Sequence, residues 1–437
     1  MANRAPKTVR TKFNSLLGLL LLSLSLLITG CAPAPAGAEV VTSGLERDTA
    51  PGDAPDELLA LSSGNTDFAL RLYQELREQE GNLFFSPYSI SAALAMTYGG
   101  ARGSTEREMA QTLGFTLPQD RLHPAFNALD LELSERTKPI DFFGTEVEGA
   151  QLDIANSLWG QAGHSFRPEY LDLLALNYGA EMHLMDFANA ADVARRTINK
   201  WVEDATEGNI QDIVSGGALN AQTRLVLVNA IYFNAKWEDP FSKSATKKAD
   251  FYLLDGGTVR VPMMSQDEPF PYLRGRDFQV FELPYVGREL AMGILMPDTG
   301  KFRDVESSLD ARQLNAIVRN LETRYLDLKM PRFDFESEFE MRDTLSEMGM
   351  RRAFGSADFS GMDGGRDLQL SEVLHKAFVK VDERGTEAGA ATSVFASVVS
   401  NPMYPLEVTV DRPFIFWIRD IPTGTLLFLG RVLNPAE

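Results

Sequence analysis

The residues of this chain that could do chemistry are few and scattered. The histidines lie at His123, His164, His183 and His375, and no two have the spacing at which one helix binds a metal ion. The sequence contains no G-x-S-x-G, H-E-x-x-H, C-x-x-C, P-loop or dinucleotide-binding motif. A catalytic triad can be assembled from distant positions, but nothing in the sequence points to one. We therefore expect no enzymatic activity, no metal and no cofactor.

Cys31 is the only cysteine, so disulfides play no part in the fold. It follows a basic start and a short Leu-rich run, which is too short for a membrane-spanning helix and is typical of a signal peptide. The residues Leu27-Ile28-Thr29-Gly30 before it resemble the lipobox of bacterial lipoproteins. We expect residues 1–30 to be a lipoprotein signal peptide and Cys31 to carry the lipid.

The segment after the cysteine is rich in Pro, Ala, Gly and Ser. We expect residues 31–57 to form a flexible tether and residues 58–437 to fold. Ala32, where an Asp commonly retains lipoproteins at the inner membrane, favours the outer membrane of a bacterial envelope, with the domain in the periplasm or at the cell surface. Without residues 1–30 the formal charge is about −23, which argues against nucleic acid and polyanionic glycans as partners.

One stretch fits no ordinary element. Residues 382–405, DERGTEAGAATSVFASVVSNPMYP, start with charge, become a run of small side chains and end at a Pro-bounded apolar patch. Their helical periodicity is poor, and they lie between two strand-like segments. Taken alone, the stretch would be interpreted as a flexible surface loop.

The elements predicted for the rest of the chain indicate an α+β fold with large, mostly antiparallel sheets. Helices are expected mainly early: 67–79; 87–98, with Ser86 as N-cap and Gly99-Gly100 as its end; 105–114, with a Thr105/Glu108 capping box; and about 194–207. Strands are expected mainly late: 224–233, which should be buried on both faces, 280–283, 290–296, 325–335, 406–418 and 425–432.

Several long motifs, in one order, resemble those of the serpins, a family of protease inhibitors. They are NLFFSPYSISAALAMTYGGARGSTEREMAQTLGF (82–115), ANSLWGQAGHSF (155–166), INKWVEDATEGNI (198–210), LVNAIYFNAKWEDPF (227–241), VDERGTEAGAAT (381–392) and DRPFIFWIRD…GTLLFLGRVLNP. The resemblance covers residues 58–437. It implies the serpin fold, with about eight to nine helices and an exposed reactive-centre loop at about 383–408.

In that family a protease cleaves the loop and is trapped as an acyl-enzyme, while the loop inserts as a new central strand of the main sheet. The hinge of the loop corresponds to Glu383, Gly385, Thr386, Glu387, Ala388, Gly389, Ala390 and Ala391. In a strand, Thr386, Ala388, Ala390, Thr392, Val394 and Ala396 would face inward, and all are small or β-branched. We expect the loop to lie outside the sheet before cleavage, with Thr386 entering first.

The family's count from the hinge glutamate places the reactive bond between Val399 and Ser400. Because the loop is about three residues longer after this bond than is usual, Val398, Met403 and Tyr404 remain alternatives. Valine suits an elastase- or subtilisin-like protease, whereas Met403 or Tyr404 would favour a chymotrypsin-like one. No basic residue lies between Arg384 and Arg412, which argues against trypsin-like targets.

Two further clusters follow from the resemblance. Ser86, Ser89, Asn229 and His375 match the shutter, a buried polar cluster beneath the point where the sheet opens. Trp237 matches the breach, where the loop first enters. Residues 117–149, where some serpins bind heparin, have three basic residues against seven acids, so we expect no heparin activation.

The sequence thus predicts a monomeric, lipid-anchored suicide inhibitor of serine proteases that forms a covalent complex with its target. The alternative is a non-inhibitory serpin that acts as a protease substrate or binding module. Bulky, charged or Pro residues from Thr386 to Ala391 would have favoured the alternative; the one charged side chain there, Glu387, would face outward.

Overall fold

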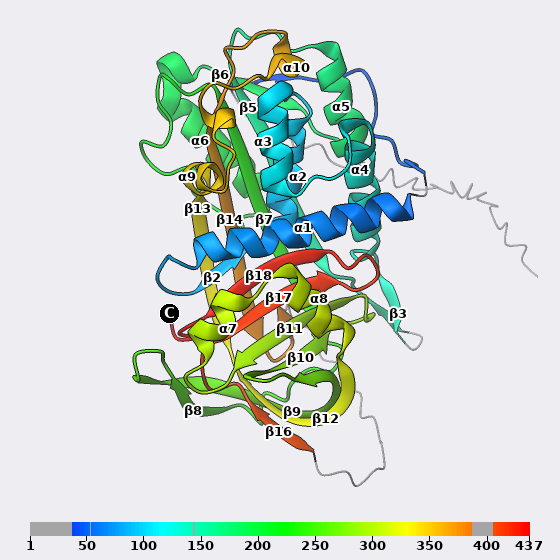
Figure 1. The fold of residues 1–437 in the computed structure, drawn as a ribbon, viewed down its shortest axis with the longest axis vertical. Coiled ribbons are helices and arrows are strands. Elements are labelled where there is room, and N and C mark those ends of the chain that lie inside the picture. Colours follow the sequence, from blue (N-terminus) through cyan, green and yellow to red (C-terminus); the bar gives the residue numbers. More distant parts are fainter. Residues whose placement is uncertain (1–36, 53, 143–144, 387–404) are drawn as a thin grey trace, which may run out of the picture. The chain divides into compact units, whose positions relative to one another are not determined.

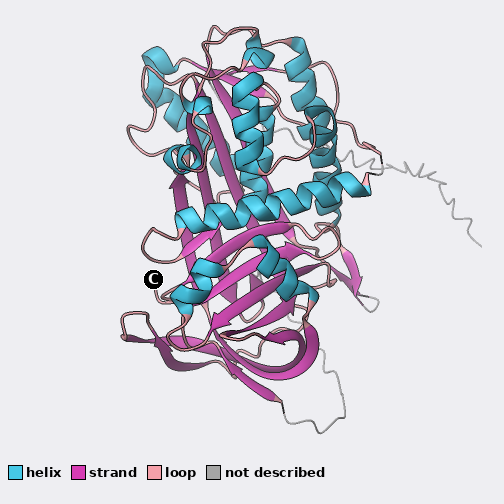
Figure 2. Ribbon diagram, in the orientation of Figure 1, coloured by secondary structure: helices cyan, strands magenta, loops and turns pink. Residues whose placement is uncertain are grey.

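Two large sheets, both mostly antiparallel, form the framework of the fold, as expected for α+β (Figures 1 and 2). The computed structural model describes residues 37–52, 54–142, 145–386 and 405–437. The expected signal peptide, Cys31 and residues 387–404 of the reactive-centre loop lie outside these ranges.

The main sheet has seven strands. Their order is β1 (Glu39–Val41), β6 (Met182–Met185), β5 (Gln151–Gln161), β7 (Leu225–Lys236), β15 (Gly385–Thr386), β14 (Leu370–Asp382) and β13 (Phe333–Glu340). Most neighbours are antiparallel, but β7 and β14 are parallel where they pair directly. A strand inserted between these two can therefore be antiparallel to both neighbours, as β15 is.

The second sheet has nine strands. They run in the order β16 (Leu406–Thr409), β12 (Glu322–Pro331), β9 (Thr258–Arg274), β10 (Phe278–Pro284), β11 (Leu290–Pro297), β17 (Phe414–Asp420), β18 (Leu426–Val432) and β2 (Leu83–Phe85), with β8 (Lys247–Tyr252) paired to β9. A small hairpin consists of β3 (Ile140–Phe142) and β4 (Thr145–Val147).

Ten α-helices occur in the described residues, slightly more than the eight to nine expected. They are α1 (Pro55–Leu76), α2 (Pro87–Tyr98), α3 (Gly103–Leu113), α4 (Gln119–Glu135), α5 (Pro168–Tyr178), α6 (Phe187–Ala205), α7 (Phe302–Ser308), α8 (Ala311–Arg319), α9 (Arg342–Glu347) and α10 (Ser360–Asp363). No helix in the described part of the chain combines the length and apolar character needed to span a membrane.

The strand β7 shows why the main sheet needs cover on both faces. Its residues Leu225, Leu227, Ile231 and Phe233 belong to the large core that includes α2, whereas Val226, Val228 and Ala230 pack in a second cluster with α6. Because alternate side chains of a strand face opposite ways, a continuous apolar run is buried on two sides. The predicted two-sided burial of 224–233 is confirmed.

The predicted tether is wrong for part of its length. Glu39–Val41 pair with β6, and the Arg47 side chain donates 2.7 Å hydrogen bonds to Asn127 and Asp130 of α4. Helix α1 begins at Pro55, twelve residues before the helix expected at 67. The segment is polar and Pro-rich, so the sequence did not indicate that the sheet edge and α4 would supply its partners.

Other differences lie at element boundaries. Helix α3 begins at Gly103 and has no side-chain cap; Thr105 Oγ1 instead accepts from the amide of Asp358. The strand-like run 325–335 is divided at Arg332 between β12 of the second sheet and β13 of the main sheet. A run of strand residues shows burial and extension, but it does not show which sheet each half joins.

Candidate functional site

The space between β7 and β14 is the candidate site. Over most of their length the strands pair directly, with Asn229 opposite His375 and Ile231 opposite Ala377. Further along, β15 lies between them: Thr386 pairs with Ala235 on one side and with Val381 on the other. Gly385 and Thr386 of the hinge are therefore part of the sheet.

This position corrects the expectation that the intact loop lies wholly outside the sheet. Thr386 is only 1% exposed, and Gly385 is buried as well. At its other end, the predicted loop range 383–408 reaches β16, which pairs in parallel with β12. The predicted hinge residues Glu387–Ala391 and the predicted bond Val399–Ser400 lie outside the described residues.

Glycine is the only residue type that fits at position 385. A Cβ atom there would lie 2.0 Å from the carbonyl oxygen of Ala235, and the backbone φ is +155°. Because neighbouring strand backbone cannot move away without breaking the ladder, any side chain would push the hinge out. The entry of the hinge into the sheet thus depends on this glycine.

The side chain of Thr386 reaches a residue that sequence reasoning missed. Its hydroxyl lies 2.7 Å from the hydroxyl of Tyr285, and both groups are buried. The Tyr285 ring stacks on Trp237 at 4.6 Å between centroids, and the Trp237 indole N–H donates to the carbonyl of Asp382 at 3.0 Å. Trp237 therefore lies at the hinge, where the resemblance placed it, and Tyr285 completes the site.

Glu383 anchors the start of the loop. Its carboxylate, 1% exposed, accepts hydrogen bonds from the Arg332 guanidinium, with Nε at 2.9 Å, and from the Thr246 hydroxyl. Its carbonyl accepts from the amide of Phe241 at 2.8 Å. Burial tends to raise the pKa of this carboxyl, but the hydrogen bonds from Arg332 and Thr246 outweigh it, so the pKa is lowered.

The four predicted shutter residues do come together. Ser86, the N-cap of α2, accepts from the amide of Ser89 at 3.1 Å, and its own amide donates to Nε2 of His375 at 3.1 Å. The Asn229 amide donates to the hydroxyl of Ser89. The side chains of α2, β7 and β14 thus meet in one hydrogen-bonded cluster beneath the closed part of the sheet.

Asn156 of β5 also joins this cluster, and sequence reasoning missed it. It lies directly opposite Asn229 in the β5–β7 pair, and its Oδ1 accepts from the Asn229 amide. The row Asn156–Asn229–His375 crosses three strands in register. The signal available in the sequence was an asparagine inside each of two strands, ANSLW and LVNAI, because a buried amide requires partners.

His375 is fully buried and uncharged. Burial in this site lowers the pKa of its imidazole to about 3. Nε2 accepts from the Ser86 amide, so Nδ1 carries the proton and donates to Oδ1 of Asn229 at 2.5 Å. The hydrogen bonds fix one neutral tautomer, and the cluster holds a single arrangement while the strands stay paired.

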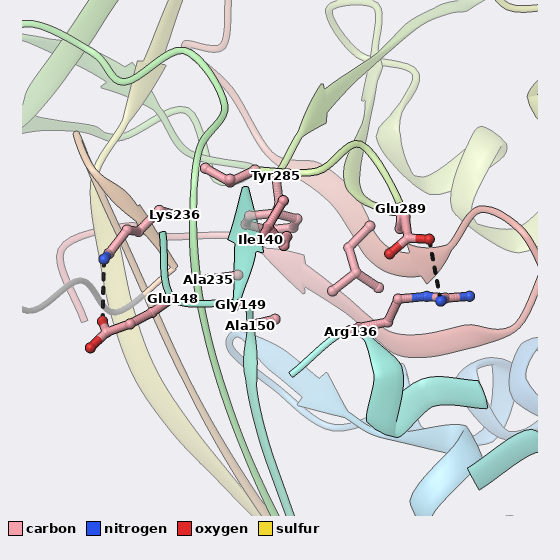
Figure 3. Close-up of a pocket in the computed structure, with 11 residues that line it drawn as sticks. Arg136, Ile140, Glu148, Gly149, Ala150, Ala235, Lys236, Tyr285 and Glu289 are labelled. Carbon is pink, nitrogen blue, oxygen red and sulfur yellow. Dashed lines mark hydrogen bonds and ion pairs between the residues drawn. The ribbon is translucent and has the colours of Figure 1, made fainter. Parts of the chain in front are cut away.

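A shallow pocket lies beside the hinge (Figure 3). One wall is formed by Ala235, Lys236 and Tyr285. The charged groups that line it are paired with each other, Lys236 with Glu148 and Arg136 with Glu289, each at 3.3 Å. In the described ranges no group of three or more His, Cys, Asp or Glu side chains could hold a metal ion.

Comparison with known proteins agrees with this geometry. The family model described as Serpin (serine protease inhibitor) matches residues 63–435. The chain is 43% identical to an uncharacterized serpin-like protein of Thermococcus kodakarensis over 85% of this chain and 84% of that protein, and 41% identical to mouse leukocyte elastase inhibitor A over 86% and 99%. A solved structure of a highly specific serpin of the insect Tenebrio molitor superposes with a TM-score of 0.75 at 31% identity, covering 88% of this chain and all of that one.

Proposed function

The chain belongs to the serpin family, and on that premise we propose that it is a suicide inhibitor of serine proteases of the elastase or subtilisin type. The protease attacks the loop, its acyl-enzyme is carried along as the loop inserts between β7 and β14, and the distorted enzyme cannot complete hydrolysis. The description of the matching family names serine protease inhibition.

The observation that carries the proposal is the register between β7 and β14. Ala235 and Val381 both pair with Thr386, and six residues earlier in each strand Asn229 and His375 pair with each other. The offset between the strands is therefore the same where they flank the hinge and where they are closed. Continued insertion needs the strands to separate but does not require either to slide.

The same register assigns each inserted residue its neighbours. Ala388 and Ala390 would come opposite Val379 and Ala377 on the core side, where only small side chains fit. Glu387 would come opposite Lys380 on the outer face, so its charge stays in solvent beside a cation.

The energy of insertion is large enough to drive trapping. Each additional ladder hydrogen bond contributes roughly 0.5–1.5 kcal/mol, so ten or more supply on the order of 10 kcal/mol. This rivals the stability of an ordinary domain, so the uninserted state is held by kinetics.

The proposals for the target protease and for the cellular location of the protein rest on the sequence. Val399 is proposed as the residue before the cleaved bond, which suits a shallow apolar pocket, and one relative in the family is named as a leukocyte elastase inhibitor. Cys31 is proposed to carry a lipid that anchors the monomer to a bacterial envelope, in the outer membrane.

The test is to mix the purified protein with an elastase-like, a subtilisin-like and a chymotrypsin-like protease. At least one should give a denaturant-resistant covalent complex on a gel, with cleavage mapped by mass spectrometry after Val399. If each protease only cleaves the loop and stays active, the inhibitor assignment fails and the non-inhibitory alternative replaces it.

A further inference from the structure

We propose that Tyr285 is a latch that holds Thr386 between β7 and β14 before cleavage, and that this latch sets how often a cleaved loop traps its protease. The second half of this inference rests on the proposed inhibitory function. Tyr285 is a positioning residue, because it touches the hinge and never the reacting bond.

The contact is well placed to act as a latch. The Tyr285 and Thr386 hydroxyls are 2.7 Å apart in a buried site, so each would lack that partner if the other moved. An unpaired buried hydroxyl is unfavourable, which makes the inserted position of Thr386 the preferred one. The neighbouring Gly385 allows the close approach that this position needs.

The backbone and ring of Tyr285 are fixed from several sides. Its amide donates to the carbonyl of Leu290 at 3.0 Å, and its ring lies between Trp237 and Phe233, with centroids at 4.6 and 5.3 Å. The latch hydroxyl therefore comes from a rigid turn between β10 and β11 of the second sheet. The hinge strand of the main sheet is therefore held against a turn of the second sheet, which is itself bonded to the end of β7: the Val286 amide donates to the Lys236 carbonyl at 2.9 Å.

The latch affects the competition, after the loop is cleaved, between loop insertion and hydrolysis of the acyl-enzyme. When Thr386 is already paired between β7 and β14, insertion only extends an existing strand. The entropy cost of ordering the first inserted residue is then already met, so insertion starts sooner than from a free loop. The acyl-enzyme is either trapped by insertion or hydrolysed first. The ratio of cleaved inhibitor to covalent complex therefore measures the rate of hydrolysis relative to the rate of insertion.

The variants Tyr285→Phe and Thr386→Val remove one hydroxyl each and keep the shape of the side chain. Loss of one buried hydrogen bond corresponds to about a fivefold change in a rate or equilibrium constant. Each variant should raise the ratio of cleaved inhibitor to complex about fivefold. The double variant should show no further increase, because both changes remove the same contact.

The matched control is Tyr170→Phe, a buried tyrosine whose hydroxyl donates to the carbonyl of Met96 at 3.1 Å. It loses a comparable hydrogen bond away from the hinge and should leave the ratio unchanged. Hydrogen exchange of the free protein gives a second measurement that needs no protease. Amides of residues 385–386 should exchange about fivefold faster in the two hinge variants, and at the wild-type rate in Tyr170→Phe.

The outcomes separate the two claims. Unchanged exchange at residues 385–386 in Tyr285→Phe would overturn the latch itself. Faster exchange with an unchanged ratio would overturn its role in trapping. If wild type forms no covalent complex with any protease, the proposed function fails, and exchange still decides whether Tyr285 holds the hinge.

Discussion

Asn229 and His375 face each other across β7 and β14, with the amide oxygen of Asn229 2.5 Å from Nδ1 of His375. This contact joins the two strands at the point where an inserted loop would pass. The same Asn229 amide donates to Ser89 and Asn156, so one side chain connects α2, β5, β7 and β14.

Asn229→Ala should therefore destabilise the protein far more than one lost hydrogen bond would. It leaves the buried Nδ1–H of His375 without its acceptor, at about 1–3 kcal/mol, and it removes a donor from the buried Ser89 hydroxyl and from the partly buried Asn156 oxygen. We expect a loss of about 3 kcal/mol in the free energy of unfolding, measured by urea denaturation. Asn320→Ala, at an exposed helix end, should lose less than about 1 kcal/mol, and equal losses in the two variants would contradict the shutter assignment.

Stability should fall in mild acid because of three buried histidines. Burial lowers the pKa of His375 to about 3 and those of His123 and His183 to about 4, whereas an unfolded histidine titrates near 6.5. Between these values the unfolded chain binds protons that the folded chain does not, so stability is lost as pH falls through 6.5 towards 4.

Each of these histidines should contribute about 2–3 kcal/mol to the loss between pH 7.5 and pH 4.5. Denaturation curves at the two pH values measure it. His183→Gln should reduce the difference between the two free energies of unfolding by about one histidine's share. If the free energy of unfolding does not change over this pH range, these imidazoles are not both buried and uncharged in the folded protein.

Gly385→Ala should release the hinge from the sheet. The new Cβ would lie 2.0 Å from the Ala235 carbonyl, so β15 cannot form as it does in the wild type. We expect faster cleavage of the loop by a non-target protease and a larger fraction of cleaved inhibitor. Gly216→Ala, with open space around its Cβ, is the control; equal behaviour of the two variants would refute the close approach.

Val399→Arg should move inhibition from elastase-like to trypsin-like proteases. The residue before the bond fills the primary specificity pocket, and a trypsin-like pocket requires a cation. The second-order rate constant for inhibition of each class measures the change. If complex formation is unaltered and the cleaved bond maps after Met403, the reactive bond was assigned in the wrong register.

Cys31→Ala should release the protein from the membrane fraction and leave inhibition intact. A lipid on one residue would hold the chain, and the inhibitory elements lie in the folded part. Fractionation followed by a protease assay tests both points. A variant that remains fully membrane-bound would remove the lipoprotein assignment.

The sequence by itself determined the elements whose signals are local. Ser86-Pro87 begins α2 and Gly99 ends it, because capping and turn chemistry act within a few residues. The apolar run at β7 and the small side chains of the hinge were likewise readable, and long motifs in one order indicated the family. The shutter residues Ser86, Ser89, Asn229 and His375 came with that resemblance rather than from their own chemistry.

The tertiary structure alone decided which distant groups meet. An asparagine inside a strand signals that Asn156 needs a partner but not which one, and Tyr285 carries no local signal, because their partners lie on strands far away in sequence and depend on register. The division of 325–335 between two sheets and the docking of residues 39–48 were decided in the same way. Thr386 has the same side chain inside or outside the sheet, and only the Ala235 and Val381 backbones and the Tyr285 hydroxyl determine that it lies inside.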